Sequence, residues 1–151
     1  MDENEYRDVY HSVNNRRCCF EKAILTRRFG CSRLVKINIA DREAAGCESD
    51  EALQQCRALK DQLRIKAAFA LKISAGNGPL PHAKEIKAQC GGLTGLYLTL
   101  HPDEENITGV KDIHSTIEAA MQQYSTLDQL PFDTIIKTIS HFKGRPKRGQ
   151  R

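Results

Sequence analysis

The stretch "SDEALQQCRALKDQLRIKAAFALKI", residues 49–73, carries the strongest periodic signal of the chain. Its apolar residues recur at steps of three and four, which predicts a helix with one buried stripe. Ser49 is suited to cap this helix, and Asp50 and Glu51 lie where the helix dipole favours negative charge. The sequence therefore predicts a long amphipathic helix over residues 50–73. Its apolar stripe consists of Ala52, Cys56, Leu59, Leu63, Ala67 and Ala70.

Working outward, residues 17–29, 81–90, 110–124 and 131–142 also favour helices, with Gly30 and Gly91–Gly92 read as stops. Residues 93–100 suit helix or strand, and their leucine spacing favours helix. Residues 35–39 alternate apolar and polar, but one strand cannot form a sheet, so we expect an extended connection. The predicted fold class is mainly α, a single compact helical domain of about five helices over residues 1–142. A disordered basic C-terminal tail, residues 143–151, is expected to follow.

Chain length indicates the number of domains, and the hydropathy of the chain and of its N-terminus indicates where the protein is located. The chain has 151 residues, which suits one domain. It contains no apolar run near the ~18 residues that a membrane span requires. The N-terminus "MDENEYRDVY" is acidic and polar, unlike a signal peptide. We therefore expect a cytoplasmic protein with no membrane span.

Six cysteines are the main chemical signal of the sequence. Six in 151 residues is well below the ~8–10% typical of disulfide scaffolds. Structural disulfides are also disfavoured in a reducing cytoplasm. Three interpretations remain open: metal ligation, a reactive thiol, and plain burial of the thiols as small hydrophobic side chains.

Four of the cysteines, Cys18, Cys31, Cys47 and Cys56, fall within 39 residues, near element boundaries or on an inward face. Four thiolates can enclose one tetrahedral zinc or bind one 4Fe–4S cluster. No pair has C-x-x-C spacing, and such wide spacing is less typical of structural zinc modules, so iron–sulfur (4Fe-4S) is preferred to zinc. Cys19 is an alternative to Cys18, because the register of the first helix is open.

A charged site of this kind needs cations nearby. Four thiolates on zinc or on an oxidised cluster leave a net negative charge, which is costly to bury alone. Residues 16–36 are rich in lysine and arginine. Arg17, Arg28 and Arg42 are the predicted cofactor-binding residues that would balance this charge.

One geometric condition limits the metal hypothesis. A continuous helix from Cys18 to Phe29 would be roughly 16 Å long. Cys18 and Cys31 can then share a metal only if the helix starts later or breaks, or if the chain doubles back.

The end of the chain carries the excess charge. The formal net charge is +4, from 23 basic and 19 acidic residues, and the five tail cations account for this excess because 18 basic residues remain without them. A tail of this kind can contact phosphates in a salt-sensitive, sequence-independent manner or bind an acidic protein. These cations are Lys143, Arg145, Lys147, Arg148 and Arg151.

The leading functional hypothesis is a small cytoplasmic metal-centre protein, with a role in electron transfer, redox sensing or metal-dependent assembly with a protein partner. The alternative is a metal-free or zinc-stabilised binding module that uses basic surfaces for nucleic acid or an acidic protein partner. No nucleophile elbow or phosphate loop is present. A thiol enzyme is the third class, and we favour a protein that is not an enzyme by itself.

Overall fold

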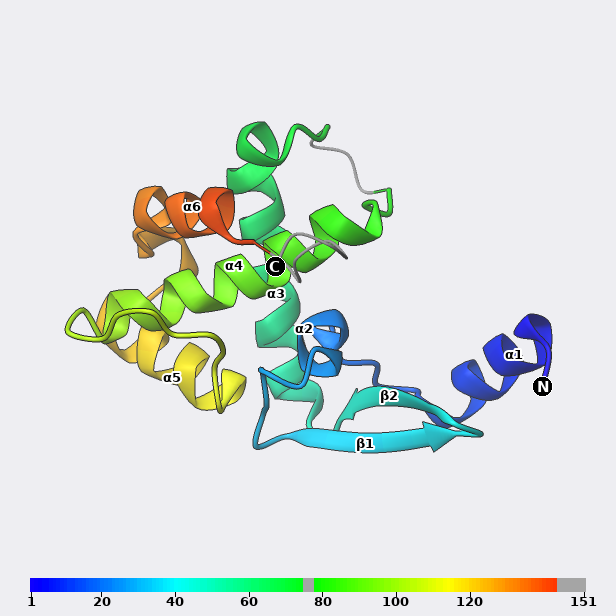
Figure 1. Cartoon of the computed structure of the whole chain (residues 1–151). Helices are drawn as coiled ribbons and strands as arrows, with labels where there is room; N and C mark the ends of the chain where they lie inside the picture. The colour runs from blue at the N-terminus through cyan, green and yellow to red at the C-terminus, as the bar shows by residue number, and fades with distance from the viewer. Residues whose placement is uncertain (75–77, 144–151) are drawn as a thin grey trace.

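The computed structural model describes residues 1–74 and 78–143, which form a mainly helical fold with one small two-stranded sheet (Figure 1). Helices α3, α4, α5 and α6 pack together, and the sheet lies beside the N-terminal end of α3. The elements are α1 (Glu3–Val13), α2 (Glu21–Leu25), β1 (Leu34–Ile39), β2 (Arg42–Cys47), α3 (Asp50–Leu71), α4 (His82–Leu100), α5 (Ile113–Tyr124), the 3₁₀ helix η1 (Leu127–Gln129) and α6 (Phe132–His141).

The predicted long helix is confirmed as α3. The Ser49 hydroxyl accepts a hydrogen bond from the Ala52 backbone N–H, so the N-cap is the expected one. Leu59, Leu63 and Ala67 are buried, and the helix ends where Lys72 adopts a left-handed conformation. The apolar stripe therefore forms the centre of the helical core.

Helix α4 corrects the prediction of a stop at Gly91–Gly92. The helix continues through both glycines to Leu100, so residues 93–100 are helical but not a separate element. A Cβ atom at Gly91 would lie 2.8 Å from the Cα of Ile139 in α6. The glycines therefore let α6 approach the α4 backbone closely, and this packing holds α4 helical despite their low propensity.

Replacing Gly91 by alanine should destabilise the fold. The gain in helix propensity is about 1 kcal/mol. Overpacking against a backbone atom costs about 1–3 kcal/mol, so we expect a net loss. Denaturant unfolding would measure it. Gly78→Ala is the control, because a Cβ at Gly78 meets nothing within 4 Å. Equal stabilities of the two variants would contradict this account.

The expected extended connection is instead one strand of a hairpin. Strands β1 and β2 pair antiparallel, with Leu34 opposite Cys47 at the open end and Ile39 opposite Arg42 at the turn. The second strand, "REAAGC", contains no β-branched or aromatic residue, so its sequence gives little strand signal. Its pairing with β1 outweighs that weak propensity.

The predicted helix over residues 17–29 is wrong in length. Helix α2 covers only Glu21–Leu25, and Arg27 adopts a positive φ of 68°, which reverses the chain. This early reversal brings the segment after Phe29 back toward the start of α2.

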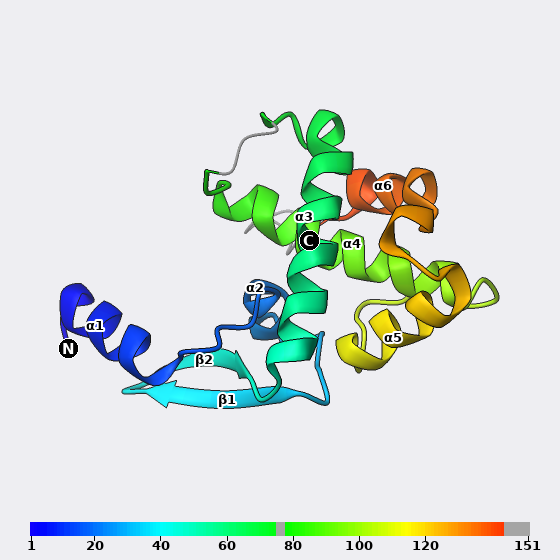
Figure 2. The same cartoon turned by 180° about the vertical axis from the view of Figure 1, so that it is seen from behind.

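An unpredicted helix, α1, precedes this region. It packs on the hairpin and stands apart from the helical body in both views (Figures 1 and 2). A small separate core joins them, formed by Tyr10, Ile39 and Ala44 with Tyr6, Val9 and Ile37 around it.

The helices predicted at residues 110–124 and 131–142 are confirmed as α5 and α6. The predicted tail lies outside the described residues except for Lys143, so the domain division at residue 142 stays a prediction. Within residues 1–74 and 78–143, no helix combines the length and the hydropathy that crossing a membrane requires.

Candidate functional site

Five of the six cysteines line one small cavity of about 20 Å³. The cavity lies where the open end of the hairpin meets the first turns of α3 and the start of α5. His114 and Ile113 at the start of α5 also line it. The five cysteines, which come from four separate segments, are Cys18, Cys19, Cys31, Cys47 and Cys56.

Main-chain hydrogen bonds hold three of these segments together. The Cys18 N–H donates to the Ala45 carbonyl at 3.0 Å, and the Cys47 N–H donates to the Arg16 carbonyl at 2.8 Å. The Glu48 N–H donates to the Arg33 carbonyl at 3.0 Å. The backbone therefore places the cysteine-bearing loops side by side without any thiol contact.

A second set of bonds attaches the Cys31 loop to α5. The Gly30 N–H donates to the Val110 carbonyl at 2.9 Å, and the Ile113 N–H donates to the Gly30 carbonyl at 2.8 Å. The Ser32 N–H donates to a carboxylate oxygen of Asp112 at 2.9 Å. Cys18 and Cys31 can share a metal only if the predicted helix between them is shorter or the chain doubles back. The reversal at Arg27 and these bonds meet that condition, because the short α2 allows Cys31 to reach the cavity that Cys18 lines.

Glu21 fixes the start of α2 beneath the cavity. Its carboxylate is buried, with 7% of the residue exposed. It accepts hydrogen bonds from the Ala45 N–H at 2.8 Å and from the Tyr10 hydroxyl at 3.0 Å. Arg17 adds an ion pair at 3.2 Å. One side chain thus joins α1, α2 and β2 next to the two adjacent cysteines.

Cys18 and Cys31 are partly buried thiols that receive backbone N–H groups. Burial raises the pKa of Cys18 to about 12, and the N–H of Phe20 acts against that rise. Burial also raises the pKa of Cys31, and the Arg33 N–H donates to its sulfur at 3.4 Å. Such N–H groups stabilise a thiolate once a metal has displaced the proton.

Cys19 and Cys56 both line the cavity, and each thiol is the main influence on the pKa of the other. The Cys56 thiol lowers the pKa of Cys19, and Lys60 and Arg57 lower that pKa further. The Cys19 thiol, followed by burial, raises the pKa of Cys56. Of the two, Cys19 is therefore the thiol that its surroundings favour as the thiolate.

In the metal-free protein, Cys19 should be alkylated by iodoacetamide about ten-fold faster than Cys90. Burial raises the pKa of Cys90 to about 11, so at neutral pH much less of Cys90 is present as thiolate. The higher intrinsic nucleophilicity of the Cys90 thiolate offsets only part of this difference in rate. Mass spectrometry of timed samples would measure both rates. Lys60→Met should slow Cys19, whereas Lys66→Met in the same helix should not. Cys90 reacting as fast as Cys19 would contradict the assignment.

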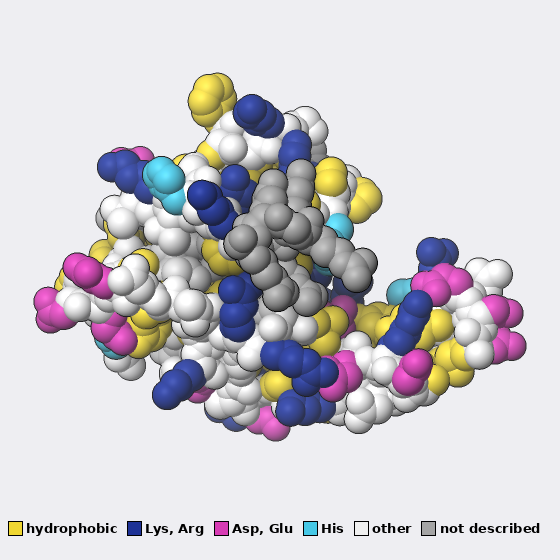
Figure 3. Space-filling view, viewed as in Figure 1, with side chains coloured by type: hydrophobic (Ala, Val, Ile, Leu, Met, Phe, Trp, Pro, Cys, Tyr) yellow, Lys and Arg dark blue, Asp and Glu magenta, His cyan; other side chains and the backbone are white. Residues whose placement is uncertain are grey.

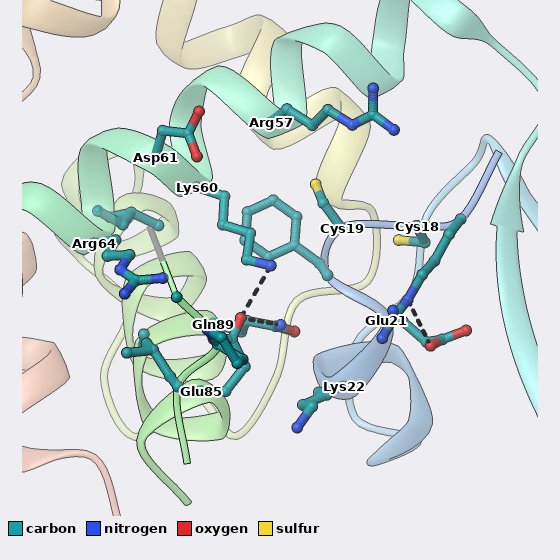
Figure 4. A pocket seen from close by; sticks show the side chains of 17 residues that line it. Cys18, Cys19, Glu21, Lys22, Arg57, Lys60, Asp61, Arg64, Glu85 and Gln89 are labelled. Atoms are coloured by element: carbon teal, nitrogen blue, oxygen red, sulfur yellow. Dashed lines mark hydrogen bonds and ion pairs between the residues drawn. The ribbon is translucent and has the colours of Figure 1, made fainter. Parts of the chain in front are cut away.

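The predicted site residues fall into two groups. The four predicted ligands, Cys18, Cys31, Cys47 and Cys56, all line the cavity, and Cys19 lines it as well. The predicted cations do not line it. Arg17 borders a neighbouring pocket that Cys18 and Cys19 also line; Figure 4 shows these two cysteines. Arg28 borders a different pocket beside α4 and α5, and Arg42 pairs with Glu3 at 3.1 Å at the turn end of the hairpin.

Other cations lie at or near the cavity. Arg33, one of the basic residues of the stretch 16–36 that could balance the charge, lines it. Arg57 and Lys60, which lower the pKa of Cys19, and the further donor His114 were not predicted. Lys60 follows Cys56 by four residues and so shares its helix face, a signal that was readable in the sequence. His114 gave no such signal, because only the loop bonds to α5 bring it to the cavity.

His114 has an unusual hydrogen-bonding state. The residue is 9% exposed, and its Nε2 lies 3.0 Å from a carboxylate oxygen of Glu118. Its buried Nδ1 has no hydrogen-bond partner among the described residues. A neutral ring that donates from Nε2 to a carboxylate leaves Nδ1 as a lone-pair donor, which is the usual state of a metal-binding histidine.

The cavity does not contain a ready-made metal site. In the described part of the chain, no three His, Cys, Asp or Glu side chains are already grouped so as to hold a metal ion. Its volume of about 20 Å³ exceeds the ~10–15 Å³ that one water needs. A single ion therefore fits between the present walls once thiols turn to it, whereas a 4Fe–4S core needs a larger cavity than these walls enclose.

The chain was compared with protein-family models, with curated proteins and with solved structures. None of them matches it. The function must therefore be argued from the cavity itself.

Proposed function

We propose that this protein binds a metal centre in the five-cysteine cavity, with iron–sulfur ahead of zinc, and that it serves in electron transfer, redox sensing or metal-dependent assembly with a protein partner. One observation carries the proposal. Five of six cysteines from four separate segments line a single cavity of about 20 Å³. Burial of thiols as simple hydrophobic side chains gives no reason for them to gather at one place.

The surroundings of the thiols support this proposal. Thiols with raised pKa values, such as Cys18 and Cys31, lose their protons to a metal, so binding should release protons and weaken as the pH falls. Arg33 at the cavity and Lys60 nearby offset the negative charge that ligation leaves. His114 also lines the cavity, and its ring nitrogen Nδ1 has no hydrogen-bond partner among the described residues, so it is a candidate additional ligand.

Iron–sulfur is placed ahead of zinc on two grounds. The ligand spacing is wide and irregular, unlike the short paired spacings of common zinc modules. Backbone N–H groups directed at the sulfurs of Cys18 and Cys31 are also a main means by which proteins set the potential of such clusters. A cytoplasmic, reducing location, which we propose with it, keeps the thiols available for ligation.

Anaerobic purification of the full chain tests the proposal directly. Iron, zinc and acid-labile sulfide per chain would be measured together with the visible absorption spectrum. Iron and sulfide in equal amounts, with a broad visible absorption, would support a cluster. Zinc alone would support the second metal. A fully folded protein that binds neither metal, even after reconstitution, would overturn the proposal.

A partner could be bound through basic surfaces instead. Figure 3 shows lysine and arginine side chains spread over this face of the helical body, whereas acidic side chains gather at the ends near α1 and near residues 103–105. We propose binding of nucleic acid or an acidic protein as the alternative function. It requires steep salt dependence and loss of affinity when residues 143–151 are deleted. Unchanged affinity in that deletion would exclude the tail as the binding element.

A further inference from the structure

A second, larger pocket adjoins the cysteine cavity. Its volume is about 530 Å³, within the range of small-molecule sites. Helix α3 forms one wall, α4 and residues 78–80 form another, and the loop with Cys18 and Cys19 closes one side (Figure 4). Because those two cysteines line both cavities, an occupant of the pocket lies next to the thiols.

The pocket has an excess of positive charge. Its lining contains five basic side chains and three acidic ones. Two of the acids already have partners within it. The Glu21 carboxylate pairs with Arg17 at 3.2 Å, and Glu85 pairs with Lys60 at 3.0 Å across the pocket (Figure 4). These pairs leave three lining cations, Lys22, Arg57 and Arg64, against one acid, Asp61, so the remaining charge is positive.

Arg57 and Arg64 lie two helical turns apart on the α3 wall (Figure 4). Neither has a carboxylate partner in residues 1–74 and 78–143. The remaining residues, 75–77 and 144–151, contain no aspartate or glutamate. Arg64 lines the pocket, and a guanidinium without a carboxylate partner is a ready donor to an oxyanion.

The pocket also has an apolar side. Pro79 and Leu80 line it opposite the basic residues of α3. A pocket of this volume suits a small molecule rather than a long polyanion, which would require an extended basic groove.

We propose that this pocket binds a small organic anion, with its phosphate or carboxylate group held by Arg64 and its apolar part against Pro79 and Leu80. Arg57 and Lys60 strengthen the attraction through their positive potential. This site goes beyond the proposed metal centre and does not depend on it, because binding is detected on the ligand rather than on a metal.

Isothermal titration of the full chain in phosphate-free, low-salt buffer tests this site. The probes are phenyl phosphate and benzoate, which share an apolar ring and differ in the acid group. We expect saturable binding at one site per chain, and the tighter probe identifies the preferred acid. If neither probe saturates, the proposal is wrong.

Variants separate a specific site from general attraction. Arg64→Met should weaken binding about ten-fold or more, the effect of losing a charge-assisted hydrogen bond. Lys66→Met removes one positive charge from the same helix outside the pocket lining and should leave the affinity unchanged. Equal effects of the two variants would overturn the proposal. Arg64→Lys, which keeps the charge but lacks the planar guanidinium, should lose affinity by an intermediate factor. Wild-type affinity in this variant would overturn the role of the guanidinium.

Discussion

Replacing Cys56 by alanine should abolish metal binding, whereas replacing Cys90 by alanine should leave the metal content at the wild-type level. Cys56 projects from α3 into the cavity that the other four thiols line. Cys90 is fully buried in the helical core and does not line that cavity. The two variants remove the same chemical group from a buried environment, so only participation in the site distinguishes them.

Metal and sulfide per chain, with the visible spectrum, would be measured for both variants after anaerobic purification. Cys31→Ala and Cys47→Ala should behave like Cys56→Ala. A Cys56→Ala protein with full metal content would contradict the proposed ligand set. A Cys90→Ala protein without metal, still folded, would contradict it as well.

The same experiment decides between two neighbouring thiols. Both Cys18 and Cys19 line the cavity, so one cysteine is in excess of a four-thiolate site. Cys18→Ala and Cys19→Ala would be compared, and the variant that retains metal identifies the cysteine that is not a ligand. Retention in both single variants would indicate that His114 or the adjacent cysteine replaces the missing ligand.

Replacing Glu21 by alanine should destabilise the fold by roughly 2–6 kcal/mol. The change leaves two buried donors, the Tyr10 hydroxyl and the Ala45 N–H, without an acceptor, and each such group costs about 1–3 kcal/mol. Arg17 is half exposed, so its unpaired charge adds little. Denaturant unfolding of the metal-free chain would measure the loss.

Glu43→Ala is the matched control for that measurement. Glu43 pairs with Arg27 at 3.0 Å on the surface, where loss of an ion pair costs about 1 kcal/mol or less. Similar losses for the two variants would contradict the structural role of Glu21. Because Glu21 also holds the segment with Cys18 and Cys19, its replacement should lower the metal content, which Glu43→Ala should not.

The amphipathic helices were predictable because their apolar residues repeat at helical spacing. Helix α3 and helix α6 agree with the sequence pattern to within a few residues. The gathering of Cys18, Cys31, Cys47 and Cys56 could be proposed only as a hypothesis, since spacing alone does not say where loops meet. These cysteines line one cavity because the chain reverses at Arg27. Arginine is not a residue typical of such turns, so the sequence does not predict the reversal.

Other parts could not be read from the sequence for identifiable reasons. The strand Arg42–Cys47 has low intrinsic propensity and depends on β1 for its conformation. The sequence predicts a helix end at Gly91, because glycine has low helix propensity. The glycine instead permits the close approach of Ile139, a tertiary contact that the local sequence does not reveal. Arg42 was assigned to the site by its proximity in sequence, but the hairpin carries it to the opposite end from Cys47.

The separate packing of α1 has a consequence for local opening. This helix rests on its own small core with the hairpin, so it can detach while the core of α3, α4 and α6 persists. Detachment would withdraw the Tyr10 hydroxyl from Glu21 and loosen the chain just before the paired cysteines. Amide hydrogens of α1 should accordingly exchange faster than those of α3, and solvent would reach the sulfur atoms through that transient opening first.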